Sequence, residues 1–528
     1  MMDKKTIWVV AACLLALIGW QWIVSKLYPP VPKQAKPPAA VTLTNKAPAA
    51  AAATFTNTPT ITAPVKPDAP EQTAVLENEF IRVTFTSWGG GIRQIELLKH
   101  RNNGSGNVLL NAESSVPALA LRGQENAAFA LEKTDTRTVV FRGPGGEKRF
   151  TLGDEYTLTG AFRLTSTNSA EIVVGSATSL NGREPPDLLT VGWLVDTKYF
   201  DRGLKQTKNG AQQEVAAARW GAVKNQFFTM LLTPGTNAAA VAYESRELAL
   251  PADWSGKTAP HAMTATLTVP VTADGRVEFS YFAGPKELKR LLALGNGQEE
   301  VMHFGFWGAI SIVLLRSMNF FHRAIPNYGV AIILITICIK ILFWPIQAKS
   351  IKSMKQMQKF QPLMTKLREK YKDDPQRMNA EMMKLYQEHK INPFAGCLPM
   401  LVQIPVFFAF YTMLRSAVEL RGAPFLWIKD LAQPDTIFHL ASFPFNPLPL
   451  LMGVSMVFQM KLTPQTGDNQ QQKMMMFMPL VFLFICYNMA SGLVLYWTVQ
   501  QLLSIAQQWW SLRQTDTEPV VLPPAKTK

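Results

Sequence analysis

Residues 329–344 read Gly-Val-Ala-Ile-Ile-Leu-Ile-Thr-Ile-Cys-Ile-Lys-Ile-Leu-Phe-Trp, an apolar run with a single charged side chain, Lys340. Such a run is typical of a membrane-spanning helix. A cation at the centre of such a helix costs roughly 2.5 to 3.5 kcal/mol on insertion scales. Because intramembrane charges are seldom retained without a role, Lys340 is a candidate functional residue.

A second interpretation of Lys340 is that its long side chain only reaches toward the membrane surface near Trp344. Two neighbours favour the functional interpretation. Thr336 and Gln347 lie four residues before and seven residues after Lys340, so all three share one helical face. A polar stripe of this kind should face protein or water and not lipid.

The composition places this run in a membrane protein with a large soluble part. The chain has 528 residues, 48% of them hydrophobic, and a formal net charge of +15. The lysines gather beside apolar segments, which anionic lipid and the positive-inside rule explain better than nucleic-acid binding does. We therefore expect a polytopic α-helical membrane protein with an all-β domain, and no direct nucleic-acid recognition.

The first part of the chain contains an anchor and a tether. The apolar run Ile7–Val24 predicts a retained N-terminal transmembrane helix within residues 1–27. Cys13 follows a sequence that resembles a lipoprotein cleavage box, but the apolar run continues past it. Residues 28–70 are rich in Pro, Ala and Thr and predict a flexible linker.

Residues 71–290 show strand periodicity and predict a large β-sandwich outside the membrane. Tyr156, Leu158 and Phe162 alternate with polar residues, and Leu267 and Val269 alternate with Thr266 and Thr268 in the same way. The four cysteines lie in or beside apolar segments, so no disulfide is expected in this domain.

The expected sandwich lacks the sequence signs of an enzyme. We find no metal-ligand spacing, nucleophile elbow or phosphate-binding loop in it, and its histidines are His100 and His261 alone. Asp154 and Glu155, read as adjacent strand residues, should point to opposite faces and form no acid/base pair. We expect no catalytic residue, no cofactor and no metal.

Residues 299–323 predict an amphipathic helix in the membrane interface. Residues 325–512 predict a core of several membrane helices. Within the latter, residues 347–390 have apolar side chains every three or four positions and predict a charged helical hairpin, kinked at Pro362 and turning at residues 372–375. The hairpin has eleven Lys or Arg against five acidic residues and should face the cytoplasm. Its methionines serve either as the core between its two helices or as an adaptable surface for apolar partners; they are Met354, Met357, Met364, Met378, Met382 and Met383.

Further apolar stretches follow at 398–414, 448–460 and 474–505, the last interrupted at residues 488–492 and therefore read as two short helices. Alternation from a cytoplasmic N-terminus leaves residues 28–323 in the periplasm and the tail 513–528 in the cytoplasm. Every cluster of positive charge then lies on the cytoplasmic side.

Several motifs resemble the YidC membrane protein insertase family, over residues 300–512 and more weakly over the N-terminal part. They are Asn392-Pro-Phe-Ala-Gly-Cys-Leu-Pro399, Gln403-Ile-Pro-Val-Phe407, Val418-Glu-Leu-Arg-Gly-Ala-Pro-Phe425, Ser491-Gly-Leu-Val-Leu-Tyr496, Trp88-Gly-Gly90 and Tyr281-Phe-Ala-Gly-Pro-Lys286. The resemblance implies a five-helix core with a polar groove open to the cytoplasm, and a periplasmic β-supersandwich, in the bacterial inner membrane. It also implies nascent membrane proteins as substrates, released into lipid with or without the Sec translocon. SecYEG, SecDF, ribosomes and targeting factors are the partners that it implies.

Two positions depart from the family. Lys340 stands where its bacterial members usually have arginine, which preserves the charge but not the planar guanidinium fork. Trp497 stands where many members have a second tyrosine after Tyr496. The resemblance adds Gln403, Tyr411, Tyr496, Trp497 and Gln500 to Lys340 and Thr336 as groove residues, and favours substrate reception for the hairpin methionines.

Two other functions remain to be weighed. A solute transporter with an intramembrane lysine site should show inverted repeats or paired broken helices, and we find none in the sequence. A membrane-tethered carbohydrate enzyme should show convergent acid/base groups in the sandwich. The sequence therefore favours an insertase.

Overall fold

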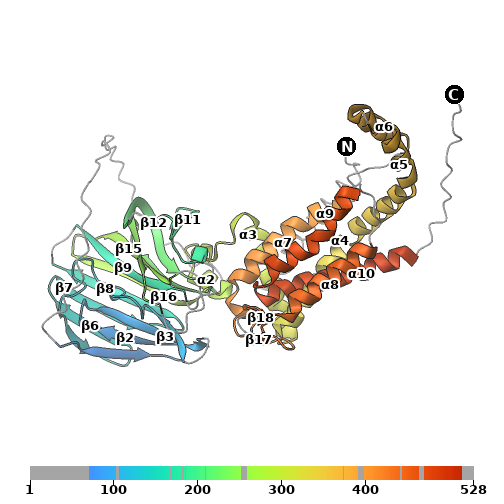
Figure 1. Ribbon diagram of the computed structural model, residues 1–528. Coiled ribbons are helices and arrows are strands. Elements are labelled where there is room, and N and C mark those ends of the chain that lie inside the picture. The colour runs from blue at the N-terminus through green and yellow to red at the C-terminus, as the bar shows by residue number, and fades with distance from the viewer. Residues whose placement is uncertain are drawn as a thin grey trace. The chain divides into compact units, whose positions relative to one another are not determined.

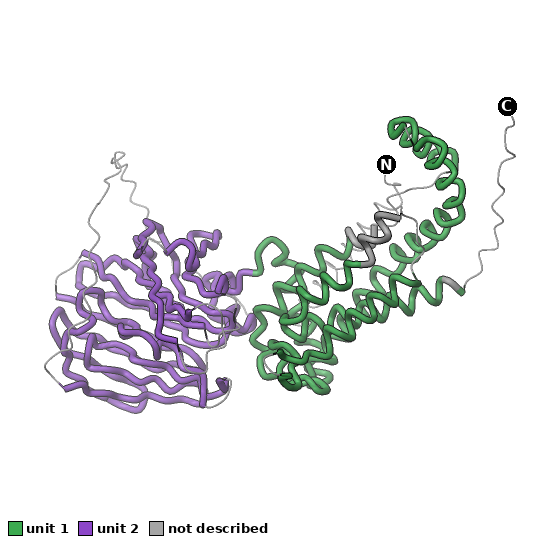
Figure 2. Tube along the Cα trace, viewed as in Figure 1, with its two compact units in different colours: residues 1–29, 304–528 green, residues 30–303 purple. Residues whose placement is uncertain are grey.

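The computed structural model describes residues 70–102, 106–165, 168–179, 184, 186–207, 210–250, 259–372, 374–389, 398–440, 443–462 and 469–513. The predicted N-terminal anchor, the linker up to residue 69 and the C-terminal tail lie outside the described residues. The chain divides into two compact units, residues 30–303 and residues 1–29 with 304–528 (Figure 2).

The first unit is an all-β domain, and its described residues form sixteen strands in two antiparallel sheets (Figure 1). The smaller sheet has the order β1-β2-β3-β4, and its strands are β1 (Thr73–Glu77), β2 (Ile81–Thr86), β3 (Gly91–Arg101) and β4 (Asn107–Leu110). The larger sheet runs β5-β6-β7-β8-β16-β13-β12-β14-β15-β9, with β10 paired to β12 and β11 paired to β10. Its strands are β5 (Ala130–Lys133), β6 (Thr138–Gly143), β7 (Gly146–Leu152), β8 (Thr157–Leu164), β9 (Ser169–Thr178), β10 (Thr190–Val195), β11 (Lys198–Gly203), β12 (Gln212–Lys224), β13 (Phe228–Pro234), β14 (Ala238–Glu247), β15 (His261–Pro270) and β16 (Arg276–Pro285).

Side chains from both sheets form the core of this domain. The ring of Phe85 on β2 lies 5.4 Å from that of Phe150 on β7 and 6.2 Å from that of Phe141 on β6. The predicted alternation on β8 is confirmed, since Leu158 and Phe162 are buried and Thr159 and Arg163 are exposed. This fold follows from the period of two in the sequence, which gives each strand one apolar face to bury.

Two details of the sequence interpretation are wrong. Thr266 is buried and not exposed, whereas Thr264 and Thr268 on the same side of β15 are half-buried. Asp154 and Glu155 lie in the turn between β7 and β8 and not in a strand. Glu155 has a φ of 53°, and its carboxylate forms an ion pair with Arg290.

A buried cation fastens the Gly89–Gly91 turn to the larger sheet. Lys148 on β7 is 1% exposed, and its Nζ donates to the carbonyl oxygens of Gly89 at 2.7 Å and Gly90 at 3.3 Å. Burial lowers the pKa of Lys148 to about 7. Both glycines have positive φ, a conformation that side chains disfavour, so the turn in the Trp88-Gly-Gly90 motif needs glycine there.

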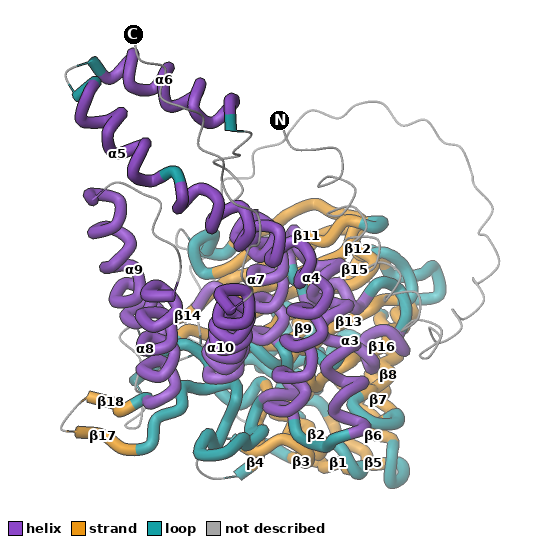
Figure 3. The backbone as a smooth tube through the Cα atoms, turned by 90° about the vertical axis from the view of Figure 1, so that its right-hand side faces the viewer, coloured by secondary structure: helices purple, strands orange, loops and turns teal. Residues whose placement is uncertain are grey.

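The second unit is helical (Figure 3). Its helices are α3 (Gly308–Ala324), α4 (Tyr328–Lys359), α5 (Gln361–Lys370), α6 (Pro375–Glu388), α7 (Leu398–Ser416), α8 (Pro447–Leu462), α9 (Asn469–Cys486) and α10 (Ser491–Arg513). A short hairpin of β17 (Phe438–Leu440) and β18 (Phe443–Phe445) precedes α8. The β-domain ends with α2 (Leu288–Leu294) and a 3-10 turn at Gln298–Met302.

The break predicted in the last apolar stretch is confirmed, since α9 ends at Cys486 and α10 begins at Ser491. The interfacial segment is shorter than predicted: only Gly308–Ala324 is α-helical, and 3-10 turns occupy Gln298–Met302 and Gly305–Trp307. Gly305, the first residue of the second turn, has a φ of 65°. Among the described helices, α4 is the one long and apolar enough to cross a membrane by length and composition, and α8 and residues 477–486 are shorter apolar helices.

Helix α4 extends from the apolar run into the charged segment without a break at Pro345. Asn327 caps its start, because the Asn327 side chain accepts a hydrogen bond from the Val330 backbone N–H at 3.1 Å. Pro362 does not kink a continuous helix. The chain leaves the helix at Phe360, and Pro362 lies in the first turn of α5, where its missing N–H leaves no bond unmade.

Candidate functional site

A cavity of about 680 Å³ lies within the helical unit, lined by α4, α7, α8, α9 and α10. Its polar lining residues are Lys340, Gln347, Ser350, Gln403, Gln459, Gln500, Gln501, Ser504, Gln507 and Gln508. Its apolar lining residues are Ile351, Met354, Ile404, Phe407, Phe408, Phe482 and Trp497. Within this lining, Lys340 is the one charged side chain.

Lys340 points into a polar corner of this cavity and is only 3% exposed. Its Nζ donates to Gln347 Oε1 at 2.5 Å and to Ser504 Oγ at 2.8 Å. Gln347 lies seven residues further along α4, so two helical turns bring it beside the ammonium group. Both acceptors are neutral, so they solvate the ammonium group without cancelling its charge.

A second polar group joins α7 to α10. Gln403 Nε2 on α7 donates to the Tyr496 hydroxyl at 2.8 Å, and Gln500 Nε2 donates to Gln403 Oε1 at 3.3 Å. The Tyr496 side chain is fully buried, and its ring stacks on that of Phe410 at 4.2 Å. Tyr496 therefore orients Gln403 from behind the cavity wall and does not itself line the cavity.

Trp497 contributes an aromatic wall beside this group. Its ring lies 4.8 Å from that of Phe407 and 5.0 Å from that of Phe482, which holds it between α7 and α9. The indole Nε1–H is buried and has no hydrogen-bond acceptor among the described residues. A substrate carbonyl or a water molecule is the natural acceptor for such a donor.

The structure gathers Lys340, Gln403, Trp497 and Gln500 around one cavity, with Tyr496 behind them, but does not bring Thr336 or Tyr411 into its lining. Thr336 is fully buried, and its hydroxyl donates to the Ile332 carbonyl at 2.7 Å within α4. Tyr411 is partly exposed, with the Arg415 guanidinium 5.7 Å from its ring. Substrate contact by either residue stays a prediction.

The sequence interpretation missed most of the polar residues in the C-terminal half of α10. Gln500, Ser504 and Gln507 are spaced four and three residues apart, so they form a polar stripe on one helical face that lines the cavity. The same spacing argument that selected Thr336 and Gln347 would have found Ser504 and Gln507. Gln459 on α8 shows no such pattern and is found only from the packing.

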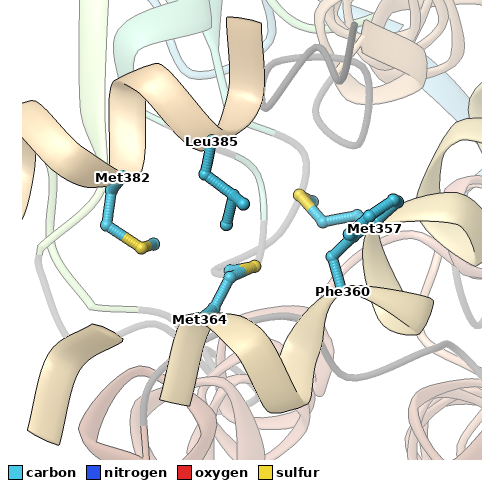
Figure 4. Packing of buried hydrophobic residues seen from close by; sticks show 5 residues of the cluster. All are labelled: Met357, Phe360, Met364, Met382 and Leu385. Atoms are coloured by element: carbon cyan, nitrogen blue, oxygen red, sulfur yellow. The ribbon is translucent and has the colours of Figure 1, made fainter. Parts of the chain in front are cut away.

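The hairpin methionines fall into two groups. Met357, Phe360, Met364, Met382 and Leu385 pack together as a small core between the end of α4, α5 and α6 (Figure 4). Asp374 caps α6 by accepting from the Arg377 backbone N–H at 3.0 Å, which confirms the predicted turn.

The other three methionines lie outside this core. Met383, next to a core residue in sequence, is 52% exposed. Met378 is partly buried, and Met354 lines the cavity near Lys340. The hairpin thus uses methionine both for its own packing and on its surface, and substrate reception stays a prediction.

Comparisons with known proteins cover both units. Residues 320–518 match the family described as 60Kd inner membrane protein, and residues 73–316 match the YidC periplasmic domain. The membrane protein insertase YidC of Geobacter sulfurreducens is 38% identical over 477 residues, covering 82% of this chain and 85% of that protein. The protein of the same name from Oleidesulfovibrio alaskensis is 34% identical and covers 98% of this chain and all of its own length.

Two solved structures are more distant. A crystal structure of an active YidC insertase covers 84% of this chain at 19% identity, with a TM-score of 0.38. A putative aldose 1-epimerase from Escherichia coli covers 40% at 10% identity, with a TM-score of 0.25. At these scores the structural likenesses add no support to either function.

Proposed function

Since this chain belongs to the YidC family and is a membrane protein insertase of the bacterial inner membrane, we propose that the cavity around Lys340 receives the polar leading segment of a nascent membrane protein. The observation that carries the proposal is a buried ammonium group with two neutral acceptors in a cavity whose lining has no other charged side chain. Such a group retains its attraction for an acidic partner.

The cavity lowers the cost of moving polar groups through the membrane. Each unpaired charge or amide in hydrocarbon costs on the order of several kcal/mol. Gln403, Gln500 and Gln507 offer amide donors and acceptors to a passing chain, and Lys340 offers a positive charge to its carboxylates. The apolar helix that follows then enters lipid and gains its transfer free energy.

Short helices near the cavity support this pathway. The apolar part of α9, residues 477–486, has ten residues and spans about 15 Å at about 1.5 Å per residue. That is roughly half the thickness of a bilayer's hydrocarbon core, so the bilayer beside it should become thinner. A thinner bilayer shortens the distance that a polar segment must cross.

The complementation of a depleted strain tests the role of the charge. We expect Lys340→Arg to insert a small client with an acidic leading segment, Lys340→Ala to insert it less well and Lys340→Glu to fail. Normal insertion of every client by both Ala and Glu variants would leave Lys340 as a bystander that reaches toward the membrane surface.

We also propose the orientation predicted from the charges, with both termini and the α5–α6 hairpin in the cytoplasm and residues 28–323 in the periplasm. A membrane-impermeant maleimide added to spheroplasts should label a cysteine placed at Thr136 in the β-domain and spare one at Gln358; both positions are exposed. Labelling of Gln358→Cys from outside would reverse this orientation.

The clients are nascent membrane proteins, and the bilayer is the second partner. We propose SecYEG, SecDF, ribosomes and targeting factors as further partners because of the family membership. Co-purification from mild detergent, with the chain as bait, tests each of them, and failure to recover SecYEG would favour Sec-independent insertion.

A further inference from the structure

The β17–β18 hairpin carries several large apolar side chains that are at least half exposed. Leu440 is 73% exposed and Phe443 is 60% exposed, on paired strands that face each other in register. Phe438 at 50%, Ile437 at 50% and Leu426 at 76% continue this surface. Figure 3 shows the hairpin beside the N-terminal end of α8.

Leu426 holds its position at a conformational cost. Its φ is 51°, in the left-handed region that a leucine rarely adopts. The backbone hydrogen bonds between Phe425 and Ile428, at 2.9 and 2.8 Å, close the turn that imposes this conformation. These bonds stabilise the turn, which leaves the Leu426 side chain 76% exposed.

Buried polar groups in the same loop form hydrogen bonds that fix it to the start of α8 and to Tyr487 after α9. Asp435 Oδ2 accepts hydrogen bonds from Trp427 Nε1 at 3.1 Å and from the Leu448 backbone N–H at 2.7 Å. The Tyr487 hydroxyl donates to the Pro444 carbonyl at 2.6 Å, and Asn446 Nδ2 donates to the Tyr487 carbonyl at 2.7 Å. The loop therefore buries these polar groups beside Ile428 and Leu431, and it leaves several large apolar side chains exposed.

The apolar surface continues onto the helices. Asn446 alone separates the end of β18 from the start of α8. Leu451, Val454 and Phe458 form an exposed stripe along α8. Phe484 and Ile485 are exposed at the end of α9, just before Tyr487. Helix stripes of this kind face lipid in a membrane protein, so the hairpin extends a lipid-facing surface past the helix ends.

We propose that the β17–β18 hairpin and Leu426 lie in the interfacial layer of the outer leaflet, with lipid as their partner. The inference rests on the proposed orientation, which places the loop between α7 and α8 on the periplasmic side. The depth is shallow, because a two-stranded hairpin leaves edge backbone groups that hydrocarbon cannot hydrogen-bond. The amphipathic ring of Trp427 suits the headgroup boundary.

Depth-dependent quenching tests this placement in the full chain. A single cysteine at Leu440, in a chain whose Cys13, Cys338, Cys397 and Cys486 are replaced by alanine, carries an environment-sensitive NBD label. The matched control is a cysteine at Lys429, an exposed polar position in the same loop. Both proteins are reconstituted without partners in vesicles of phosphatidylcholine and phosphatidylglycerol that contain lipid with a doxyl group at acyl carbon 5 or 12.

We expect label at position 440 to be quenched at least twofold more strongly than label at position 429, and more by 5-doxyl than by 12-doxyl lipid. Equal quenching at 440 and 429 would overturn the proposal and leave the surface to a protein partner. Stronger quenching by 12-doxyl lipid would overturn the shallow placement. Client insertion by both labelled proteins shows that they are folded, and quenching does not depend on insertion, so the two proposals fail separately.

The accessibility of Leu440→Cys to maleimide shows on which side of the membrane the hairpin lies. Quenching of the predicted kind together with maleimide reaction of Leu440→Cys only from the cytoplasmic side would contradict the outer-leaflet placement, while leaving client reception by the cavity intact.

Discussion

Lys340 carries a charge whose transfer into a membrane costs free energy, and its surroundings reduce that cost. The two acceptors around its Nζ replace part of the water that burial removes, and neither brings a negative charge. A carboxylate partner would stabilise the lysine better but would also neutralise the field that attracts a client. The arrangement therefore favours reception over stability.

Removal of an acceptor of the Lys340 ammonium group should impair insertion modestly. A hydrogen bond between membrane helices contributes about 0.6 kcal/mol on average, so we expect Ser504→Ala and Gln347→Leu each to lower the insertion rate by roughly two- to threefold. The measurement is client insertion into proteoliposomes of matched protein content.

Ser455→Ala is the control for the serine. Ser455 is buried on α8, and its hydroxyl donates only to the Met452 carbonyl of its own helix at 2.7 Å, outside the cavity lining. We expect it to insert clients normally. Equal rates for Ser504→Ala, Gln347→Leu and the parent would show that these contacts do not position Lys340.

The sequence predicted some residues of the cavity lining correctly and others not. Lys340 stands out because a cation contrasts with its apolar neighbours. Gln403, Trp497 and Gln500, which the family resemblance implies as groove residues, line the cavity, whereas the Thr336 hydroxyl bonds within its own helix. A side chain's helical face can be read from spacing, but whether it bonds locally or reaches a cavity depends on the neighbouring helix.

At the scale of the element, α4 connects the cavity to the α5–α6 hairpin. The helix carries Lys340 in its apolar half and Met357 in the hairpin core, with Met354 between them at the cavity. The helix continues through Pro345, which lies between these parts. A movement of the hairpin would therefore act on the cavity lining through one helix.

Adjacent methionines allow the two roles of the hairpin to be separated. Met382→Ala removes a buried side chain, at a cost on the order of 2 to 5 kcal/mol for a full cavity, and should speed proteolysis of residues 361–389 in the full chain. Met383→Ala removes an exposed side chain and should leave the proteolysis rate unchanged. If surface methionines receive clients, Met383→Ala should still slow insertion.

The measurement pairs limited proteolysis with insertion on the same preparations. Normal insertion by Met383→Ala together with slow insertion by Met382→Ala would assign the methionines to packing alone. Deletion of residues 353–388 tests the whole element, and undiminished growth of the deletion strain would argue against any receptive role.

At the scale of the whole molecule, the sequence predicted both units from two different periods. Alternation identified the strands, and long apolar runs identified the helices. It did not predict the order of the strands in the larger sheet, where β8 pairs with β16 and β9 with β15, because such pairing joins segments about a hundred residues apart. The cavity likewise needs five helices to be packed before its lining is defined.

The most direct test of the account is a charge exchange between Lys340 and its client. Insertion into proteoliposomes is measured for the parent and Lys340→Glu, each with a client whose leading segment carries acidic residues and with the same client carrying lysines there. Two charges about 4 Å apart interact by at least ~1 kcal/mol even in water, which corresponds to about a fivefold preference. We predict that the parent prefers the acidic client by at least that factor and that Lys340→Glu prefers the basic one. Loss of insertion of both clients to the same extent would contradict the account, because position 340 would then matter for structure and not for charge.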